Sequence, residues 1–212
     1  MKISSSLLAC DFANFGQEVQ RLTNAGADFL HFDIMDGCFV SNITFGPGVV
    51  SAVRRFSNLP FEIHLMTTEP IRLVERFISA GGDVIIFHLE ATSNVASTIR
   101  EIKNFKKKVG LAVCPKTSVS EVLPFLETVD MVTIMTVEPG AGGQSFIKSQ
   151  ILELQELVRY ASSMKIPVLF EVDGGINPET AKISKNSGAD ILVAGTFLFS
   201  KNDLKSSISE LK

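Results

Sequence analysis

The sequence predicts an α/β fold, a single-domain (β/α)8 TIM barrel over residues 1–212, and two observations support this prediction. The first is a segment that occurs three times with small changes. In it, a glycine can end a helix in the left-handed conformation, and an aspartate and an apolar, β-forming run follow. The copies are NAGADFL (24–30), SAGGDVI (79–85) and NSGADIL (186–192). Each is typical of the joint between a helix and the next strand.

The second observation is the spacing of these joints along the chain. Their glycines, Gly26, Gly81 and Gly188, are separated by 81−26=55 and 188−81=107 residues, which are close to one and two multiples of about 54. A repeat of about 27 residues holds one strand and one helix. The 212 residues of the chain therefore accommodate about eight such units.

Eight strands are expected at this period, each a short run rich in apolar and β-branched residues. In chain order they cover 2–7 (KISSSL), 28–33 (DFLHFD), 61–65 (FEIHL), 83–88 (DVIIFH), 108–113 (KVGLAV), 131–136 (MVTIMT), 167–172 (PVLFEV) and 190–194 (DILVA). The segments between them show helical spacing, as at Val49, Val53 and Phe56. Strict alternation requires a parallel sheet, and eight units favour a closed barrel. An open doubly wound sheet is the alternative, but no G-x-G-x-x-G motif follows the first strand.

Composition and charge exclude several classes of protein. The chain is 45% hydrophobic and 20% charged, as expected of one globular domain, and its net charge of -3 argues against a nucleic-acid partner. The one dense basic run, KKK at 106–108, is expected at a solvated helix end. No apolar stretch is long enough to span a bilayer, and the N-terminus lacks a signal peptide, so a cytoplasmic enzyme is expected. Three cysteines without C-x-x-C spacing indicate reduced thiols.

Polar residues gather at the ends of the predicted strands, where the active sites of such barrels lie. They are Ser6 after the first strand, His31 and Asp33 at the second, His64 at the third, His88 at the fourth and Asp173 at the seventh. All three histidines of the chain are therefore at strand ends on one side of the barrel. His31 and Asp33 are two residues apart, so their side chains point the same way and share one target.

A divalent metal ion is the target that this donor set predicts. His31, Asp33, His64 and Asp173 supply mixed nitrogen and oxygen ligands, which suit zinc, iron(II), manganese or cobalt. A histidine that stood alone would be typical of a core residue, but these four converge from separate strands. His88 would crowd the ion as a fifth ligand, and the following Leu89-Glu90-Ala91 offers it no partner, so a structural or supporting role is expected. Asp36 is expected to cap a turn before Gly37.

Glycines at the ends of the last three strands indicate a site for an anion. They lie in PGAGGQSF (139–146), DGGIN (173–177) and AGT (194–196). Glycine lets the backbone approach a ligand closely, and barrel enzymes often hold a phosphate after strands seven and eight. Ordinary turn glycines are the alternative interpretation. Met35, Met66 and Met135 also follow strand ends and are either core residues or an apolar wall that keeps water from a carbanion-like intermediate.

These segments resemble a known family. HFDIMDG, NITFGP, EIHLM, FHLEAT, MTVEPGAGGQSF and EVDGGINPET occur in the order found in ribulose-phosphate 3-epimerases, and the resemblance covers nearly the whole chain. It implies a (β/α)8 barrel that interconverts D-ribulose 5-phosphate and D-xylulose 5-phosphate in the pentose phosphate pathway, with one divalent metal ion and no organic cofactor. The implied metal ligands are the same four residues, His31, Asp33, His64 and Asp173.

The resemblance also implies roles for individual residues. Asp33 and Asp173 would flank the sugar, one as general base and the other as general acid, and exchange the C3 proton through a planar enediolate. The expected substrate contacts are Ser6, His64, Met35, Met66, Met135, Gly142, Gly143, Gly174, Gly175, Gly195 and Thr196. The last of these occupies a position usually held by serine. Members of the family are usually homo-oligomers.

The chain departs from the family pattern at a few positions that bear on lid closure, turnover and the choice of substrate. Cys38 and Ser41 stand where His and Pro are common, Ala141 replaces a Phe, and Cys114 precedes a proline in place of Asn or Lys. Ser5 replaces a Pro in the first strand. None of these changes removes a predicted ligand or acid-base group.

Two alternatives therefore stay open: a 3-epimerase of a longer ketose phosphate, such as D-allulose 6-phosphate, and a catalytically inactive phosphosugar-binding barrel. An aldolase or decarboxylase is disfavoured, because no lysine stands at a strand end and the D-x-K-x-x-D pattern is missing.

Overall fold

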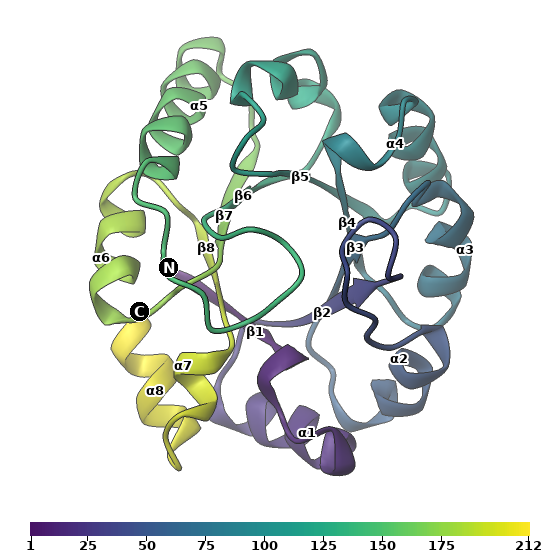
Figure 1. Cartoon of the computed structure of the whole chain (residues 1–212), viewed down its shortest axis with the longest axis vertical. Coiled ribbons are helices and arrows are strands. Elements are labelled where there is room, and N and C mark those ends of the chain that lie inside the picture. The colour runs from purple at the N-terminus through teal and green to yellow at the C-terminus, as the bar shows by residue number, and fades with distance from the viewer.

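The computed structural model describes residues 1–212 and contains eight parallel strands that close into a barrel in chain order, with β8 pairing with β1 (Figure 1). The strands are β1 (Lys2–Ser6), β2 (Phe29–Met35), β3 (Phe61–Met66), β4 (Val84–His88), β5 (Lys108–Val113), β6 (Met131–Met135), β7 (Leu169–Asp173) and β8 (Ile191–Ala194). The predicted barrel is confirmed. Every strand lies within two residues of its expected bounds.

Helices surround the barrel on the outside (Figure 1). They are α1 (Phe15–Ala25), α2 (Pro47–Val53), α3 (Ile71–Ser79), α4 (Val95–Asn104), α5 (Gln150–Met164), α6 (Pro178–Asn186), α7 (Thr196–Phe199) and α8 (Leu204–Leu211). Short 3₁₀ helices cover Leu7–Ala9, Phe12–Asn14, Arg54–Phe56 and Leu89–Ala91. None of the helices combines the length and the apolar character needed to cross a bilayer.

The alternation of strands and α-helices is interrupted once, between β5 and β6. There the connection is a 3₁₀ helix, Val119–Thr128, with Pro124 inside it. Proline lacks an N–H group and its ring clashes with the carbonyl four residues earlier, which disfavours a regular α-helix. The segment still buries Val119, Val122 and Leu126, so it covers the barrel as a helix would.

Aspartates at the joints fasten alternate pairs of strands at the lower rim of the barrel. Asp28 and Asp83 accept hydrogen bonds from the backbone N–H groups of Ile3 (2.9 Å) and Phe61 (3.1 Å), each on the preceding strand. Two further joints repeat this contact, with Asp130 accepting from Val109 and Asp190 from Phe170. The fastened strands are β1, β3, β5 and β7. The structural unit that repeats is therefore two strands wide, which explains the joint spacing of about 54 residues.

The run of lysines at 106–108 does not lie on a helix end as expected. The helix α4 ends at Asn104, and Lys107 and Lys108 instead pair with joint aspartates: Lys107 Nζ lies 2.9 Å from Asp83 Oδ1, and Lys108 Nζ lies 2.7 Å from Asp130 Oδ1. The lysines neutralise carboxylates at the strand starts. The three cysteines are free, as predicted.

Two apolar clusters make up the core. The larger one fills the layer between the strands and the helices. The smaller one fills the lower end of the barrel interior with Val84, Ile86, Ala112, Met131 and Ile191. Above it the interior changes to buried polar residues, among them His31, Glu62, Thr133 and Glu171. Because burial of polar groups is unfavourable unless they are paired, this polar layer marks the region where a function must be sought.

Candidate active site

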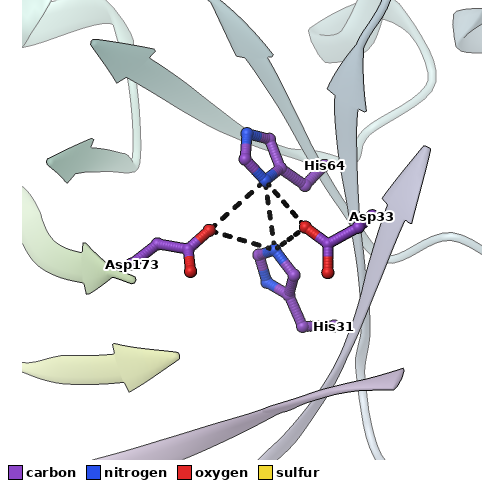
Figure 2. A group of neighbouring side chains, drawn as sticks. All are labelled: His31, Asp33, His64 and Asp173. Carbon is purple, nitrogen blue, oxygen red and sulfur yellow. Dashed lines mark hydrogen bonds and ion pairs between the residues drawn. The ribbon is translucent and has the colours of Figure 1, made fainter. Parts of the chain in front are cut away.

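Four side chains converge inside the barrel from three strands, His31 and Asp33 from β2, His64 from β3 and Asp173 from the end of β7 (Figure 2). His31 Nε2 lies 3.2 Å from His64 Nδ1. Asp33 Oδ1 lies 3.5 Å from the first of these nitrogens and 3.4 Å from the second. Asp173 Oδ2 lies 3.8 Å and 3.5 Å from the same two atoms. The structure thus brings together all four residues that the sequence picked out.

The geometry of this donor set fits a divalent metal ion. One donor atom from each residue lies within 4.8 Å of all the others. A tetrahedral ion with ligand distances of about 2.0 to 2.1 Å places its donors about 3.3 to 3.4 Å apart. The distances between donor pairs run from 3.2 Å to 3.8 Å, so small side-chain movements suffice to hold such an ion.

Burial and charge are balanced at this site in a way that favours a cation at its centre. Burial by itself lowers the pKa of His31, but the adjacent Asp33, Glu62 and Asp173 raise that pKa well above its ordinary value. Burial raises the pKa of Asp33, and the two imidazoles lower it far more. The carboxyl group of Asp33 is therefore ionised at neutral pH and can accept a proton.

The two oxygens of Asp33 have different surroundings. Its Oδ1 faces the two imidazoles, whereas its Oδ2 accepts a hydrogen bond of 2.7 Å from the hydroxyl of Ser6. Ser6 ends β1, and its Oγ also accepts from the backbone N–H of Leu8 at 3.3 Å, which begins a 3₁₀ turn. Ser6 was expected to contact a substrate. The structure shows that its hydroxyl also holds one oxygen of Asp33.

A cavity of about 310 Å³ opens above the four side chains. The predicted residues that line it are Ser6, Asp33, Met35, Met66, Met135, Gly142, Gly143, Asp173, Gly174, Gly175, Gly195 and Thr196. His31 and His64 lie behind this lining and are fully buried. The expected contact of His64 with a substrate therefore stays a prediction.

The lining contains neither lysine nor arginine, so an anionic group in the cavity must be held by neutral donors. Gly175 has a φ of +63°, and a Cβ there would lie 2.9 Å from the backbone of Phe146. A Cβ on Gly142 would lie 3.6 Å from Thr196 Oγ1, so the segment after β6 faces the segment after β8. Backbone N–H groups from both segments can thus approach one ligand.

Two loops meet over this cavity. The segment between β6 and α5 crosses the barrel mouth (Figure 1), and Gln144 Nε2 ties it to itself by donating to the carbonyls of Glu138 and Ala141. Asn42, in the segment after β2, donates to the carbonyl of Gly140 at 3.3 Å. Asp36 caps the turn before that segment, as predicted, by accepting from the N–H groups of Cys38 and Phe39.

Two buried glutamates beneath the cluster were missed by sequence reasoning. Glu62 Oε2 lies 3.3 Å from His31 Nδ1 and accepts a hydrogen bond from Ser4. Glu171 Oε1 accepts from Thr133 Oγ1 at 2.8 Å. Burial and the charge of Glu62 raise the pKa of Glu171 well above its ordinary value. The signal was available, because these glutamates lie two residues before His64 and Asp173 and hence on the same strand faces.

His88 stands beside the cluster without joining it, and its partner corrects one expectation. His88 Nε2 lies 2.9 Å from His64 Nε2, while His88 Nδ1 lies 3.4 Å from Glu90 Oε2 and 3.3 Å from Cys114 Sγ. Glu90 was expected to offer no partner, but the 3₁₀ turn after β4 directs it back towards the ring. Burial lowers the pKa of His88 to about 4.

Comparison with known proteins agrees with this site. The model of the ribulose-phosphate 3 epimerase family matches residues 2–199. The ribulose-phosphate 3-epimerase of Bacillus subtilis (strain 168) is 42% identical over 100% of this chain and 98% of its own length. The ribulose-5-phosphate-3-epimerase, chloroplastic, of Arabidopsis thaliana is 40% identical over 99% of this chain and 75% of its own length.

Solved structures of lower identity share the fold. A 3-hexulose-6-phosphate synthase has a TM-score of 0.73 at 16% identity, over 100% of this chain and 98% of its own. KGPDC from Streptococcus mutans, in complex with a sugar phosphate, has a TM-score of 0.74 at 11% identity, over 99% of this chain and 94% of its own. With matches over its whole length to relatives at about 40% identity, the chain belongs to the ribulose-phosphate 3-epimerase family of isomerases.

Proposed function

We propose that this protein interconverts D-ribulose 5-phosphate and D-xylulose 5-phosphate by moving the proton at C3. The observation that carries the proposal is the placement of two carboxylates, Asp33 on β2 and Asp173 on β7, on either side of one pair of imidazole nitrogens at the floor of the cavity (Figure 2). The names of the relatives and the sugar phosphate bound in a neighbouring barrel support a sugar phosphate as substrate.

The metal-dependent part of the proposal rests on the donor set. His31, Asp33, His64 and Asp173 would hold one divalent ion, which we propose to be zinc, iron(II), manganese or cobalt, and no organic cofactor is required. Bound there, the ion would supply Lewis-acid stabilisation of the negative charge that develops on the sugar, worth several kcal/mol. The buried aspartates and imidazoles define where that charge must lie.

The aspartates carry the proton transfers in this proposal. One carboxylate removes the C3 proton from one face of the sugar, and the other delivers a proton to the opposite face of the planar enediolate. A single base would return the proton to the face from which it came. Asp33 is ionised, and the hydroxyl of Ser6 holds its Oδ2 while Oδ1 faces the imidazoles. Ser6 thus orients the oxygen that exchanges the proton.

The rest of the cavity would bind the substrate. The phosphate is assigned to backbone N–H groups of Gly142, Gly143, Gly174, Gly175 and Gly195, with the side chain of Thr196. Met35, Met66 and Met135 are at most 4% exposed and line the same cavity. Their side chains would exclude water from the enediolate and limit its protonation by solvent. We further propose a single-domain, homo-oligomeric, cytoplasmic enzyme of the pentose phosphate pathway.

The test is isotope exchange during turnover. D-Ribulose 5-phosphate incubated with the protein in heavy water should gain deuterium at C3 as D-xylulose 5-phosphate forms. A parallel incubation with D-allulose 6-phosphate measures the preference between the two ketose phosphates. Faster epimerisation of the hexulose would replace the proposed substrate with the alternative. Binding of both sugars without any exchange would instead identify an inactive phosphosugar-binding barrel.

A further inference from the structure

The two imidazoles of the cluster present different nitrogens to its centre. His31 faces it through Nε2, and His64 faces it through Nδ1. A neutral imidazole carries hydrogen on one nitrogen and a lone pair on the other. If both rings are to offer lone pairs to one ion, His31 must carry its hydrogen on Nδ1 and His64 must carry its hydrogen on Nε2. These are opposite tautomers, so each ring needs its own device to select the correct form.

The device for His31 is Glu62. Its Oε2 lies 3.3 Å from His31 Nδ1, and both side chains are fully buried. An ionised carboxylate can only accept hydrogen bonds. Ser4 occupies the same oxygen as a second donor and thereby holds it in place from β1. With Glu62 as acceptor, the hydrogen of His31 lies on Nδ1 and the lone pair of Nε2 points to the cluster.

The device for His64 has two parts, His88 and Glu90. The Nε2 atoms of His64 and His88 are 2.9 Å apart, so one donates and the other accepts. Glu90 decides which, because its Oε2 lies 3.4 Å from His88 Nδ1 and its Oε1 is held by the backbone N–H of Cys114 at 2.9 Å. A carboxylate at His88 Nδ1 places the hydrogen there and leaves His88 Nε2 bare. His64 Nε2 must then be the donor, and the lone pair of His64 Nδ1 points to the cluster.

The same chain of hydrogen bonds argues against a second metal ion at His88, Glu90 and Cys114, although these three residues also gather closely. An ion at His88 Nδ1 would displace the hydrogen from that atom. His88 Nε2 already accepts from His64, so the ring would have to lose both hydrogens. The group therefore acts on the neighbouring imidazole and does not form a separate site.

We propose that Glu62 and the His88–Glu90 pair are positioning residues, which select opposite tautomers of His31 and His64 so that both rings direct lone pairs to one ion. This inference rests on the metal site of the proposed function and adds the residues that preset its ligands. Such outer partners of metal-binding histidines typically change metal affinity about 10- to 100-fold when they are removed.

Nitrogen-15 NMR of the imidazole rings tests the inference directly, because the chain has three histidines and each can be assigned by its absence in a variant. In the zinc-loaded protein we expect hydrogen on Nδ1 of His31, on Nε2 of His64 and on Nδ1 of His88. Hydrogen on His88 Nε2 would overturn the inference. If the wild type binds no zinc, the proposed metal site is refuted, and the tautomer of His88 in the metal-free protein still decides the inference.

Paired variants separate positioning from mere packing. In His88→Gln the side-chain amide oxygen can accept from His64, so zinc affinity should stay close to that of the wild type. His88→Leu has no acceptor and should lower zinc affinity about 10- to 100-fold. Val122→Ala, in the outer layer of the core, is the control for lost stability and should leave zinc affinity unchanged. Equal zinc affinities of His88→Gln and His88→Leu would contradict the inference.

The last variants identify which neighbour directs His88. Glu90→Leu removes the carboxylate and should allow hydrogen on His88 Nε2, with a fall in zinc affinity. Cys114→Ala removes the sulfur that lies 3.3 Å from His88 Nδ1 and should leave both the tautomer and the zinc affinity as they are. A tautomer that changes in Cys114→Ala but not in Glu90→Leu would overturn the role of Glu90.

Discussion

Replacing one aspartate at a time tests the proposal that two groups move the proton. Asp33→Asn and Asp173→Asn each remove one acid-base group and leave a neutral amide oxygen in its place. Asp33 lies on β2 and Asp173 on β7, and these strands are not neighbours in the closed barrel. Each carboxylate can therefore serve only its own face of a sugar bound between them. Neither variant can compensate for its loss with the other residue.

The size of the effect follows from the role of a general acid or base. Loss of such a group costs about 10²- to 10⁴-fold in rate, which corresponds to about 3 to 5 kcal/mol of transition-state stabilisation. Epimerisation should fall by this amount in both variants. The remaining aspartate can still remove and return a proton on its own face. Each variant should thus wash deuterium into C3 of one epimer without inverting it, and the favoured epimer should differ between the two variants.

Proton NMR in heavy water, started separately from each ketose phosphate, measures inversion and exchange in the same sample. Asp36→Asn is a matched control, because Asp36 follows the same strand but caps a turn and does not line the cavity. Its epimerisation rate should stay near that of the wild type. The two-base reasoning fails if Asp33→Asn or Asp173→Asn keeps half of the wild-type rate, or if both exchange the same epimer.

Three further outcomes are expected. Ser6→Ala should lower kcat about 10- to 100-fold at unchanged zinc content, because a hydrogen bond to the charged Asp33 is worth about 1.5 to 3 kcal/mol; an unchanged kcat would exclude the orienting role. Asp83→Ala should lower the free energy of unfolding by about 2 to 4 kcal/mol in denaturant titrations, since a strand N–H and Arg54 both lose their acceptor, while zinc affinity stays constant. In the metal-free protein, acidification from pH 7 to pH 4 should destabilise the wild type relative to His88→Gln by about 3 kcal/mol. The pKa of His88 is about 4 in the fold against 6.5 when unfolded, so the unfolded chain takes up the proton first as the pH falls; parallel pH profiles of the two proteins would contradict this.

The strands could be located from the sequence because their signals are local. Each is a short apolar run bounded by a glycine or an aspartate, and buried parallel strands need such runs on both faces. The ends are less certain, as β2 continues to Met35 and β7 begins only at Leu169. A strand ends where its neighbour stops supplying hydrogen bonds, and the register of neighbours is not a local property.

The helical segments were less determined by local patterns. Residues 119–128 form a 3₁₀ helix where a regular α-helix would satisfy the strand-helix period. Pro124 is visible in the sequence, yet only the packed structure shows that the segment keeps its apolar contacts despite the change. The lysine run at 106–108 likewise found its partners, Asp83 and Asp130, on other elements.

The candidate site divides in the same way. The period of two along a strand placed His31 and Asp33 on one face, and the general geometry of barrels placed His64 and Asp173 at the same end. The same rule applied two residues earlier would have found Glu62 and Glu171. These statements concern the direction of side chains within one strand, which the sequence by itself determines.

Only the tertiary structure decided which atoms face one another. It placed Nε2 of one imidazole against Nδ1 of the other, turned Glu90 back to His88 and joined Ser6 to Asp33 across two strands. These contacts link residues that are distant in the chain, and their distances depend on how eight strands tilt and close. Local sequence patterns determine what each strand offers to the interior, whereas closure of the barrel determines which groups meet there, because it alone sets the positions of strands relative to one another.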